Sequence, residues 1–276
     1  MKNKKMKKTK IQAMAFFLRE LDMRRRNIGW QAVWLVYDLM WAMSVGFLGL
    51  GVAAITGIKL DVNQYVLYLM IGSFMWTYLS SVFITVSWAI TWERWEGTIE
   101  YTFMAPVKRT IHLFGNSIFA IIYGLIRMFV VLGLSELIFD LNLSKANFVA
   151  AGLILALASV SFIGLGMMAA VLPLISPEMG DKMTMITEAI IMMISGIFYP
   201  VSTLPVWMQH VASISPGTYA LEGMRQALIS GASISELSSF IWPLIVIGIV
   251  LIPLGNYVFS LGENYCKRTG KLKRDG

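Results

Sequence analysis

Stretches of mostly apolar residues alternate with short polar connections along most of the chain, a pattern typical of proteins with several membrane-spanning helices. A single crossing needs about 20 apolar residues in helical conformation. We predict six transmembrane helices within one domain that covers residues 31–265. The predicted spans occupy roughly residues 31–57, 65–91, 113–139, 146–177, 183–199 and 237–262. The expected fold class is therefore an all-α integral membrane protein.

Residues 1–30 precede the first span and combine basic and apolar positions. Six lysines fall in the first ten residues, and Ile11, Met14, Leu18 and Leu21 then recur at helical spacing. This pattern predicts a basic cytoplasmic tail and an amphipathic helix at the membrane interface. A disordered basic tail is the alternative, and it fits residues 1–9 better than residues 11–26. The basic segment is too long for a cleaved signal peptide.

The stretch of residues 195–226 follows the fifth predicted span and is apolar but repeatedly interrupted by prolines. Backbone that is not helical at membrane depth is tolerated only where protein or a water-filled cavity satisfies its polar groups. We expect two short helices in a re-entrant hairpin over residues 200–231. Ser202 or Thr203 would cap the first helix, and Pro216 would begin a second helix that ends near Gly231.

Composition and charge support a membrane protein and orient it. Hydrophobic residues make up 57% and charged residues 14% of the chain, whereas soluble domains have about 25% charged residues. Of the 23 lysines and arginines, ten lie in residues 1–30 and five follow Tyr265. With residues 1–30 and 266–276 as cytoplasmic tails, nineteen basic residues face the cytoplasm and three face outward. This bias predicts a cell-membrane location with the hairpin outside, and it accounts for the net charge of +7 without nucleic acid.

Motifs for catalysis, nucleotide binding and metal binding are not found. The nearest echo of a phosphate-binding loop, Thr269-Gly270-Lys271, lacks the upstream glycine. His112 and His210 are far apart in sequence and in no metal-binding spacing. Cys266 is the single cysteine and is interpreted as an interface residue, with acylation as the alternative. We therefore expect no catalytic residue, metal or cofactor on this chain.

The cytoplasmic connection between the second and third spans, residues 92–112, combines acidic and aromatic side chains. Three glutamates are spaced i, i+3 and i+7, which places them on one face of a helix: Glu93, Glu96 and Glu100. Thr98 could cap a short helix that begins at Ile99, and Pro106 would end it. Such a helix suits docking to a partner protein. The alternative is an interfacial loop whose tryptophans mark the headgroup level.

Two motifs resemble those of the ABC-2 family of ATP-binding-cassette permeases. The pattern E-x-x-E-G-T-x-E-x-x-x-x-x-P resembles the family's coupling-helix region; its residues here, with the neighbouring aromatic, are Glu93, Trp95, Glu96, Gly97, Thr98, Glu100 and Pro106. The hairpin resembles the family's outer re-entrant motif at Gly196, Phe198, Tyr199, Pro200, Pro205, Trp207, Pro216, Glu222 and Arg225. The order of elements also matches, so the resemblance covers essentially the whole chain.

The resemblance implies a type V exporter fold. Two permease halves would pair, as a homodimer, and each would rest on a cytoplasmic ABC ATPase subunit that binds ATP and magnesium. Residues 92–112, termed the coupling segment below, would transmit closure of the ATPase dimer. Residues 200–231, termed the outer hairpin, would form the outer gate or lid.

Charged residues within predicted spans are candidates for function or for structural pairing. Asp38 lies a turn or two inside the first span, where an interfacial structural role and a transport role are both open. Arg127 is deeper and could pair with Glu136 or with a group on another span. For Glu188 we expect a structural salt bridge, with Lys182 as the candidate partner.

The leading function is export of an amphiphilic or hydrophobic compound, such as a drug, lipid or antimicrobial. Export of a polysaccharide or lipid-linked glycan stays open, because a sugar passage is expected to show aromatic linings and the spans carry Trp30, Trp34, Tyr37, Trp41 and Trp76. A secondary transporter should show two matching helix interruptions, whereas one is found. A membrane-embedded enzyme should show polar residues clustered at one depth.

Overall fold

The computed structural model describes residues 2–56, 62–139, 141 and 143–270, and every regular element in these ranges is a helix. The expected all-α fold class is thus confirmed for the described residues. The helices in chain order are α1 (Lys2–Arg26), α2 (Ile28–Thr56), α3 (Val62–Ser87), α4 (Ala89–Trp95), α5 (Ile99–Met104), α6 (Arg109–Phe139), α7 (Phe148–Ala169), α8 (Val171–Ile175), α9 (Gly180–Ile194), the 3₁₀ turn η1 (Val201–Thr203), α10 (Val206–Ala212), α11 (Pro216–Ile229) and α12 (Ser238–Thr269).

Five helical segments of the described chain are long and apolar enough to cross a membrane. They coincide with the first, second, third, fourth and sixth predicted spans. Their bounds are Ile28–Val52 in α2, Gln64–Ser87 in α3, Arg109–Phe139 in α6, Phe148–Ile175 across α7 and α8, and Ser238–Thr269 in α12.

The fifth predicted span is shorter than expected. We predicted that it would continue to Tyr199, but α9 ends at Ile194 and has 15 residues, fewer than the about 20 that a full crossing needs. Gly196 has a φ of +71°. A glycine in this left-handed conformation commonly ends a helix because it lacks the Cβ atom that would clash. The expectation that the helix runs through Tyr199 is wrong for this reason.

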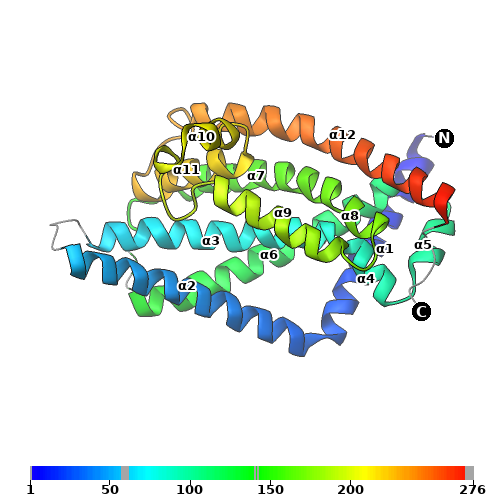
Figure 1. The fold of residues 1–276 in the computed structure, drawn as a ribbon, viewed down its shortest axis with the longest axis horizontal. Coiled ribbons are helices and arrows are strands. Elements are labelled where there is room, and N and C mark those ends of the chain that lie inside the picture. Colours follow the sequence, from blue (N-terminus) through cyan, green and yellow to red (C-terminus); the bar gives the residue numbers. More distant parts are fainter. Residues whose placement is uncertain (1, 57–61, 140, 142, 271–276) are drawn as a thin grey trace.

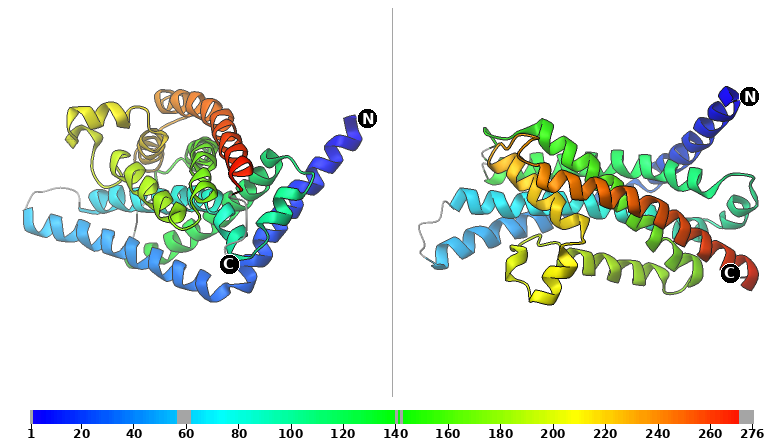
Figure 2. Two further views of the ribbon diagram at one scale, coloured as in Figure 1. Left: turned by 45° about the vertical axis from the view of Figure 1, so that its right-hand side comes forward. Right: turned by 90° about the horizontal axis from the view of Figure 1, so that it is seen from above.

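The long helices run side by side along the long axis of the molecule (Figure 1). The short helices α4 and α5 lie at the same end as the beginning of α1 and the end of α12, and α10 and α11 lie toward the opposite end. The coupling segment and the outer hairpin are therefore separated along the bundle. Helix α1, which precedes α2, projects at an angle to the bundle axis (Figure 2).

Helix α1 covers the segment for which we predict an amphipathic interface helix. The side chains of Ile11, Met14 and Leu18 are exposed, whereas Ala13 and Met23 are buried against the rest of the chain. An exposed apolar stripe on a basic helix suits contact with a membrane surface. The helix begins at Lys2, so the disordered tail considered for residues 1–9 is wrong for residues 2–9.

Helix α3 forms the centre of the bundle. In an apolar stretch of 18 residues within its span, 89% of residues are buried, whereas the figure is 22% for the corresponding stretches of α2 and α12. Helices α7 and α12 pack on each other with their backbones in close contact. A Cβ atom on Gly255 would lie 2.6 Å from the carbonyl oxygen of Gly164, so glycine is what allows this approach. The outer surfaces of α2 and α12 stay available to lipid or to a second chain.

The outer hairpin contains two short helices, as predicted, but the first begins later. Ser202 and Thr203, the expected N-caps, lie in η1, and the Thr203 hydroxyl donates to the Pro200 carbonyl oxygen at 2.8 Å. Pro205 is the residue that precedes α10, and the expected cap is therefore wrong. Helix α11 begins with Pro216 in its first turn, as predicted.

Candidate functional site

The coupling segment folds as two short helices instead of one. Helices α4 and α5 are separated by Gly97, whose φ is +69°. Helix α5 begins at Ile99, directly after Thr98, and ends two residues before Pro106, as the sequence predicts. The Thr98 hydroxyl, however, donates to the carbonyl oxygen of Glu93 at 3.4 Å and does not cap α5.

The three glutamates do not share one exposed face. Glu93 is only 1% exposed, whereas Glu96 and Glu100 lie on the surface. The predicted common face of one helix is therefore wrong, because the helix that would carry all three is broken between the second and the third. Glu93 faces the interior of this chain.

Glu93 joins three helices in a buried polar cluster. Its Oε1 atom accepts a hydrogen bond from Arg19 Nη1 of α1 at 2.7 Å and lies 3.1 Å from His112 Nε2 of α6. The ring of His112 lies 4.4 Å from that of Phe16, between centroids. Sequence reasoning missed this cluster because its members come from three helices and share no spacing pattern. The cluster fastens the coupling segment to the interface helix.

The pKa values of the two buried glutamates near this cluster move in opposite directions. Burial alone raises the pKa of Glu93, but His112 and Arg19 together outweigh it, and the pKa falls below the ordinary value of 4.5. Burial raises the pKa of Glu20, against the opposing effect of Arg19 and Arg24. Ionised Glu93 therefore stabilises the fold above about pH 4.5, and this stabilisation is lost as the pH falls through the lower, folded-state pKa.

Glu93→Gln should destabilise the protein by about 2–3 kcal/mol. Removing one member of a buried ion pair costs about 3–5 kcal/mol, and the lower value is expected because the side chain of Arg19 is 32% exposed. The difference from the wild type should shrink as the pH falls below 4.5, the ordinary pKa of this carboxyl. Thermal unfolding in detergent, measured from about pH 3.5 to about pH 7.5, would give both the loss of stability and its dependence on pH.

Glu96→Gln is the matched control on the same connection. Glu96 pairs with Arg26 at 2.5 Å, but the Arg26 side chain is 63% exposed, and exposed ion pairs contribute about 0–1 kcal/mol. Equal losses of stability in the two variants would contradict the structural role assigned to Glu93.

The surface of the coupling segment carries large exposed side chains. Trp95 is 61%, Tyr101 78% and Met104 80% exposed. Glu96 and Glu100 lie on the same short segment and are also exposed. We call these five residues the docking face. Exposed aromatic and methionine side chains are typical of surfaces that bind another protein.

Two arginines fasten the back of the coupling segment to other helices. Arg94 donates from Nε and Nη2 to the carbonyl oxygens of Pro173 at 3.2 Å and Leu174 at 3.0 Å, both on α8. Arg109 donates to the carbonyl oxygen of Thr102 at 2.6 Å and pairs with Glu263 of α12 at 3.1 Å. A displacement of the docking face would thus act on α1, α8 and α12 through charged groups.

At the other end of the bundle, Arg225 of α11 holds the turn that follows α9. It is 4% exposed, and it donates to the carbonyl oxygens of Gly196 at 3.1 Å and Ile197 at 2.5 Å. Its guanidinium lies 3.7 Å from the centroid of the Tyr68 ring on α3. The nearest acid, Glu222, lies 3.9 Å away and is half exposed. Arg225 therefore connects α9, α11 and α3.

The other residues predicted for the outer hairpin are more dispersed. Phe198 lies near the ring of Trp41, with 5.9 Å between centroids, and Tyr199 donates to the Met193 carbonyl oxygen at 2.5 Å. Trp207 is 66% exposed on α10. The structure thus brings Gly196 and Arg225 together and leaves Trp207 at the surface.

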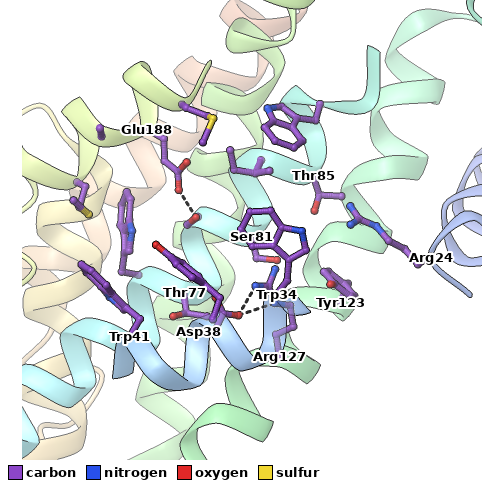
Figure 3. A pocket seen from close by; sticks show the side chains of 18 of the residues that line it. Arg24, Trp34, Asp38, Trp41, Thr77, Ser81, Thr85, Tyr123, Arg127 and Glu188 are labelled. Carbon is purple, nitrogen blue, oxygen red and sulfur yellow. Dashed lines mark hydrogen bonds and ion pairs between the residues drawn. The ribbon is translucent and has the colours of Figure 1, made fainter. Parts of the chain in front are cut away.

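A cavity of about 330 Å³ lies between α2, α3, α6 and α9 (Figure 3). Aromatic side chains form much of its wall, and hydroxyl groups of α3 form another part. The aromatic residues are Trp34, Tyr37, Trp41, Trp76, Trp88, Trp92 and Tyr123, and the hydroxyl residues are Thr77, Ser80, Ser81 and Thr85. In the described part of the chain, no three His, Cys, Asp or Glu side chains gather in a way that could hold a metal ion.

Asp38 and Arg127, two of the charged residues found within predicted spans, meet in this cavity. Arg127 Nε donates to Asp38 Oδ2 at 2.8 Å, and Nη2 donates to the same oxygen. Of the partners considered for Arg127, the group on another span is the one observed, and Glu136 is not. Sequence spacing could not select Asp38, because 89 residues separate it from Arg127.

Glu188 also reaches the cavity, from α9. Its carboxylate accepts a hydrogen bond from the hydroxyl of Ser80 on α3. The salt bridge expected with Lys182 is not present among the ion pairs of the described residues, and that expectation is wrong. Six positions along a helix place two side chains about 120° apart around its axis, so Lys182 points elsewhere.

The aromatic lining could have been predicted in part. Trp34, Tyr37, Asp38 and Trp41 follow helical spacing and share one face of α2. Trp76 joins them from α3, whereas Trp30 is not part of the lining. Arg127 of α6 and Glu188 of α9 stood out in the sequence as charges within predicted spans, but their place in one cavity depends on how the helices pack.

The chain is similar in sequence to known transport proteins. The family model described as ABC-2 type transporter matches residues 11–229. The chain is 24% identical over 174 residues to the "Probable multidrug ABC transporter permease YbhR" of Escherichia coli K12 and to the same protein of strain O157:H7. These alignments cover 60% of this chain and 45% of each relative. The chain thus spans about half the length of the curated relatives it matches.

Proposed function

The chain belongs to the ABC-2 type transporter family, and from that premise we propose that it is the membrane subunit of an ATP-binding-cassette exporter. ATP and Mg²⁺ are bound by a separate cytoplasmic ATPase subunit, and this chain supplies the passage. The substrate is an amphiphilic or hydrophobic compound. The name of the E. coli relatives, a probable multidrug permease, supports that class.

The observation that carries the proposal is the docking face. It combines exposed Trp95, Tyr101 and Met104 with two glutamates at one end of the bundle, where a partner can reach them. Behind it, Glu93, Arg94 and Arg109 connect the segment to four other helices. Because buried ion pairs resist separation, closure of the ATPase against this face would move these helices together.

The substrate enters the cavity between α2, α3, α6 and α9. Its volume of about 330 Å³ and its aromatic walls fit a small amphiphile, since ligand pockets measure about 300–1,000 Å³. Met185 and Met192 line it as well and add adaptable apolar surface. The aromatic wall also favours a second candidate, a glycan exporter, because sugars stack on aromatic rings. Identification of the molecule that co-purifies with the protein separates these two candidates.

The functional unit is a homodimer, in which a second copy of this chain completes the passage. Helix α2 supplies a cavity wall yet leaves most of its surface exposed, and Trp34, Tyr37 and Trp41 on it are 40%, 59% and 36% exposed. Aromatic side chains are enriched at protein interfaces. A second copy would cover this face.

The outer hairpin completes the fifth predicted crossing, which α9 begins, and serves as the outer gate. Helix α9 alone is too short for a full span, and the hairpin that follows is held to it by Arg225. The positive-inside bias places residues 1–30, the coupling segment and residues 266–276 on the cytoplasmic side of the cell membrane. The hairpin then faces outward.

His210→Cys should be labelled by a membrane-impermeant thiol reagent added to intact cells. His210 is exposed on α10 of the outer hairpin, and the native Cys266 is buried and should give little background. The measure is the extent of labelling with reagent added outside only. Lys108→Cys, exposed in the coupling segment, is the control and should be labelled only after the cells are opened. The reverse pattern would invert the topology.

The ATPase reaction tests the assignment of roles. Purified alone, this chain should not hydrolyse ATP, whereas its complex with the ATPase subunit should. Hydrolysis of ATP by the chain alone would contradict the proposal.

A further inference from the structure

The charged groups of the cavity do not all have a counter-charge. Arg127 and Asp38 neutralise each other through two hydrogen bonds to one carboxylate oxygen. Arg24, at the edge of the cavity, acts electrostatically on Glu20, one helical turn earlier on α1. Glu188 is different: within the described ranges, its recorded partner is the neutral hydroxyl of Ser80.

The position of Glu188 makes the missing counter-charge significant. It lies eight residues after the first residue of α9, about 12 Å along the helix at 1.5 Å per residue. An acidic side chain at such a depth is expensive unless it is paired, and it is a functional candidate by default. Its side chain points into the cavity toward α3, on the side opposite the bound pair of Asp38 and Arg127 (Figure 3).

The walls around Glu188 supply the second requirement for binding an organic cation. Trp34, Tyr37 and Trp41 of α2 and Trp76 of α3 line the same cavity. The faces of aromatic rings carry negative electrostatic potential and attract cations within about 6 Å. The rings of Trp34 and Tyr37 meet edge to face, at 82° and 5.9 Å between centroids, so they present surfaces in two directions.

We propose that this cavity binds lipophilic organic cations, with the Glu188 carboxylate as counter-charge and the tryptophan and tyrosine rings as cation–π partners. The inference rests on the proposed function, since it names the substrate class of the cavity assigned to transport. It excludes anionic amphiphiles as preferred substrates, because Arg127 is already paired with Asp38 and Arg24 already lies over the rings of Trp92 and Tyr123. The hydroxyl of Ser80 holds the carboxylate in place until the cation arrives.

The test compares two ions of the same shape and opposite charge, tetraphenylphosphonium and tetraphenylborate. Their binding to the full chain in nanodiscs of zwitterionic lipid is measured by quenching of tryptophan fluorescence. The amount of each ion that partitions into the lipid is measured by equilibrium dialysis against empty nanodiscs and is subtracted. The wild type should bind the phosphonium more tightly than the borate. Glu188→Gln should weaken phosphonium binding about tenfold or more, a change of about 1.4 kcal/mol, without weakening borate binding.

Two further variants serve as controls for this result. Glu178→Gln removes an exposed carboxylate just before α9 and outside the cavity, and it should leave the binding of both ions unchanged. Glu188→Asp keeps the charge and should retain most of the phosphonium affinity. Equal phosphonium affinity in the wild type and Glu188→Gln, or tighter binding of the borate by the wild type, would overturn the inference.

The comparison of ions in the wild type needs no variant, so a folding defect in Glu188→Gln cannot hide a failure. Failure of this inference also differs from failure of the proposed function. If ATP-driven transport did not depend on Glu188 or on the charge of the substrate, the proposed cation site would be wrong and the exporter function would stand. Cation binding that depends on Glu188, in a chain that associates with no ATPase, would do the reverse.

Discussion

Trp95→Ala combined with Tyr101→Ala should weaken the complex with the ATPase subunit at least about 30-fold. Both side chains are mostly exposed on the docking face, at 61% and 78%, so their apolar surface is available to a partner. Truncation of a tryptophan or tyrosine at the centre of an interface costs about 2 kcal/mol or more, which corresponds to about 30-fold in affinity. The dissociation constant between the purified permease and the ATPase subunit measures this effect.

Tyr257→Ala is the matched control for this prediction. Tyr257 is 61% exposed, but it lies on α12 within a candidate span, away from the docking face, and its loss should leave ATPase binding unchanged. The thermal stability of the double variant should also stay near that of the wild type, because exposed side chains contribute little to folding. Wild-type affinity in the double variant would show that the partner binds elsewhere.

Arg127→Gln and Asp38→Asn should each destabilise the protein by about 3–5 kcal/mol, because each leaves its partner as an unpaired charge in a buried site. The side chains of Arg127 and Asp38 are 16% and 11% exposed. The double variant Asp38→Asn with Arg127→Gln should recover part of this loss, since two neutral amides can bond to each other. The free energy of unfolding in detergent, measured for all four proteins, gives the coupling between the two sites.

Lys267→Gln provides the comparison for an exposed ion pair. Lys267 pairs with Glu263 at 2.7 Å and is 50% exposed, so its loss should cost about 0–1 kcal/mol.

The double variant decides whether Asp38 and Arg127 are coupled. If its loss of stability equalled the sum of the losses in the two single variants, the pair of Asp38 and Arg127 would not be coupled. The two charges would then have separate roles in the cavity.

Local signals in the sequence predicted the elements whose boundaries depend on neighbouring residues. The mostly apolar stretches located five long helices. Helix α5 begins after Thr98, and α11 begins with Pro216 in its first turn, as expected from helix-end preferences. Gly97 belonged to the coupling motif from the start, but its left-handed backbone, which separates α4 from α5, was not foreseen.

Contacts between helices could not be predicted in the same way. The pairing of Asp38 with Arg127, and that of Glu188 with Ser80, joins positions 89 and 108 residues apart. A single sequence holds no information on which faces of α2, α3, α6 and α9 meet. The length of α9 was overestimated because residues 195–199 are mostly apolar, and the conformation of Gly196 outweighed that signal.

The central claim is that this chain is the membrane part of an exporter that another subunit drives with ATP. The most direct measurement is uptake of tetraphenylphosphonium into inside-out vesicles that contain this chain, the ATPase subunit, or both. We expect ATP-dependent uptake only when both are present, and loss of that uptake in the Trp95→Ala, Tyr101→Ala variant. Uptake that proceeds with this chain alone, or without ATP hydrolysis, would contradict the claim.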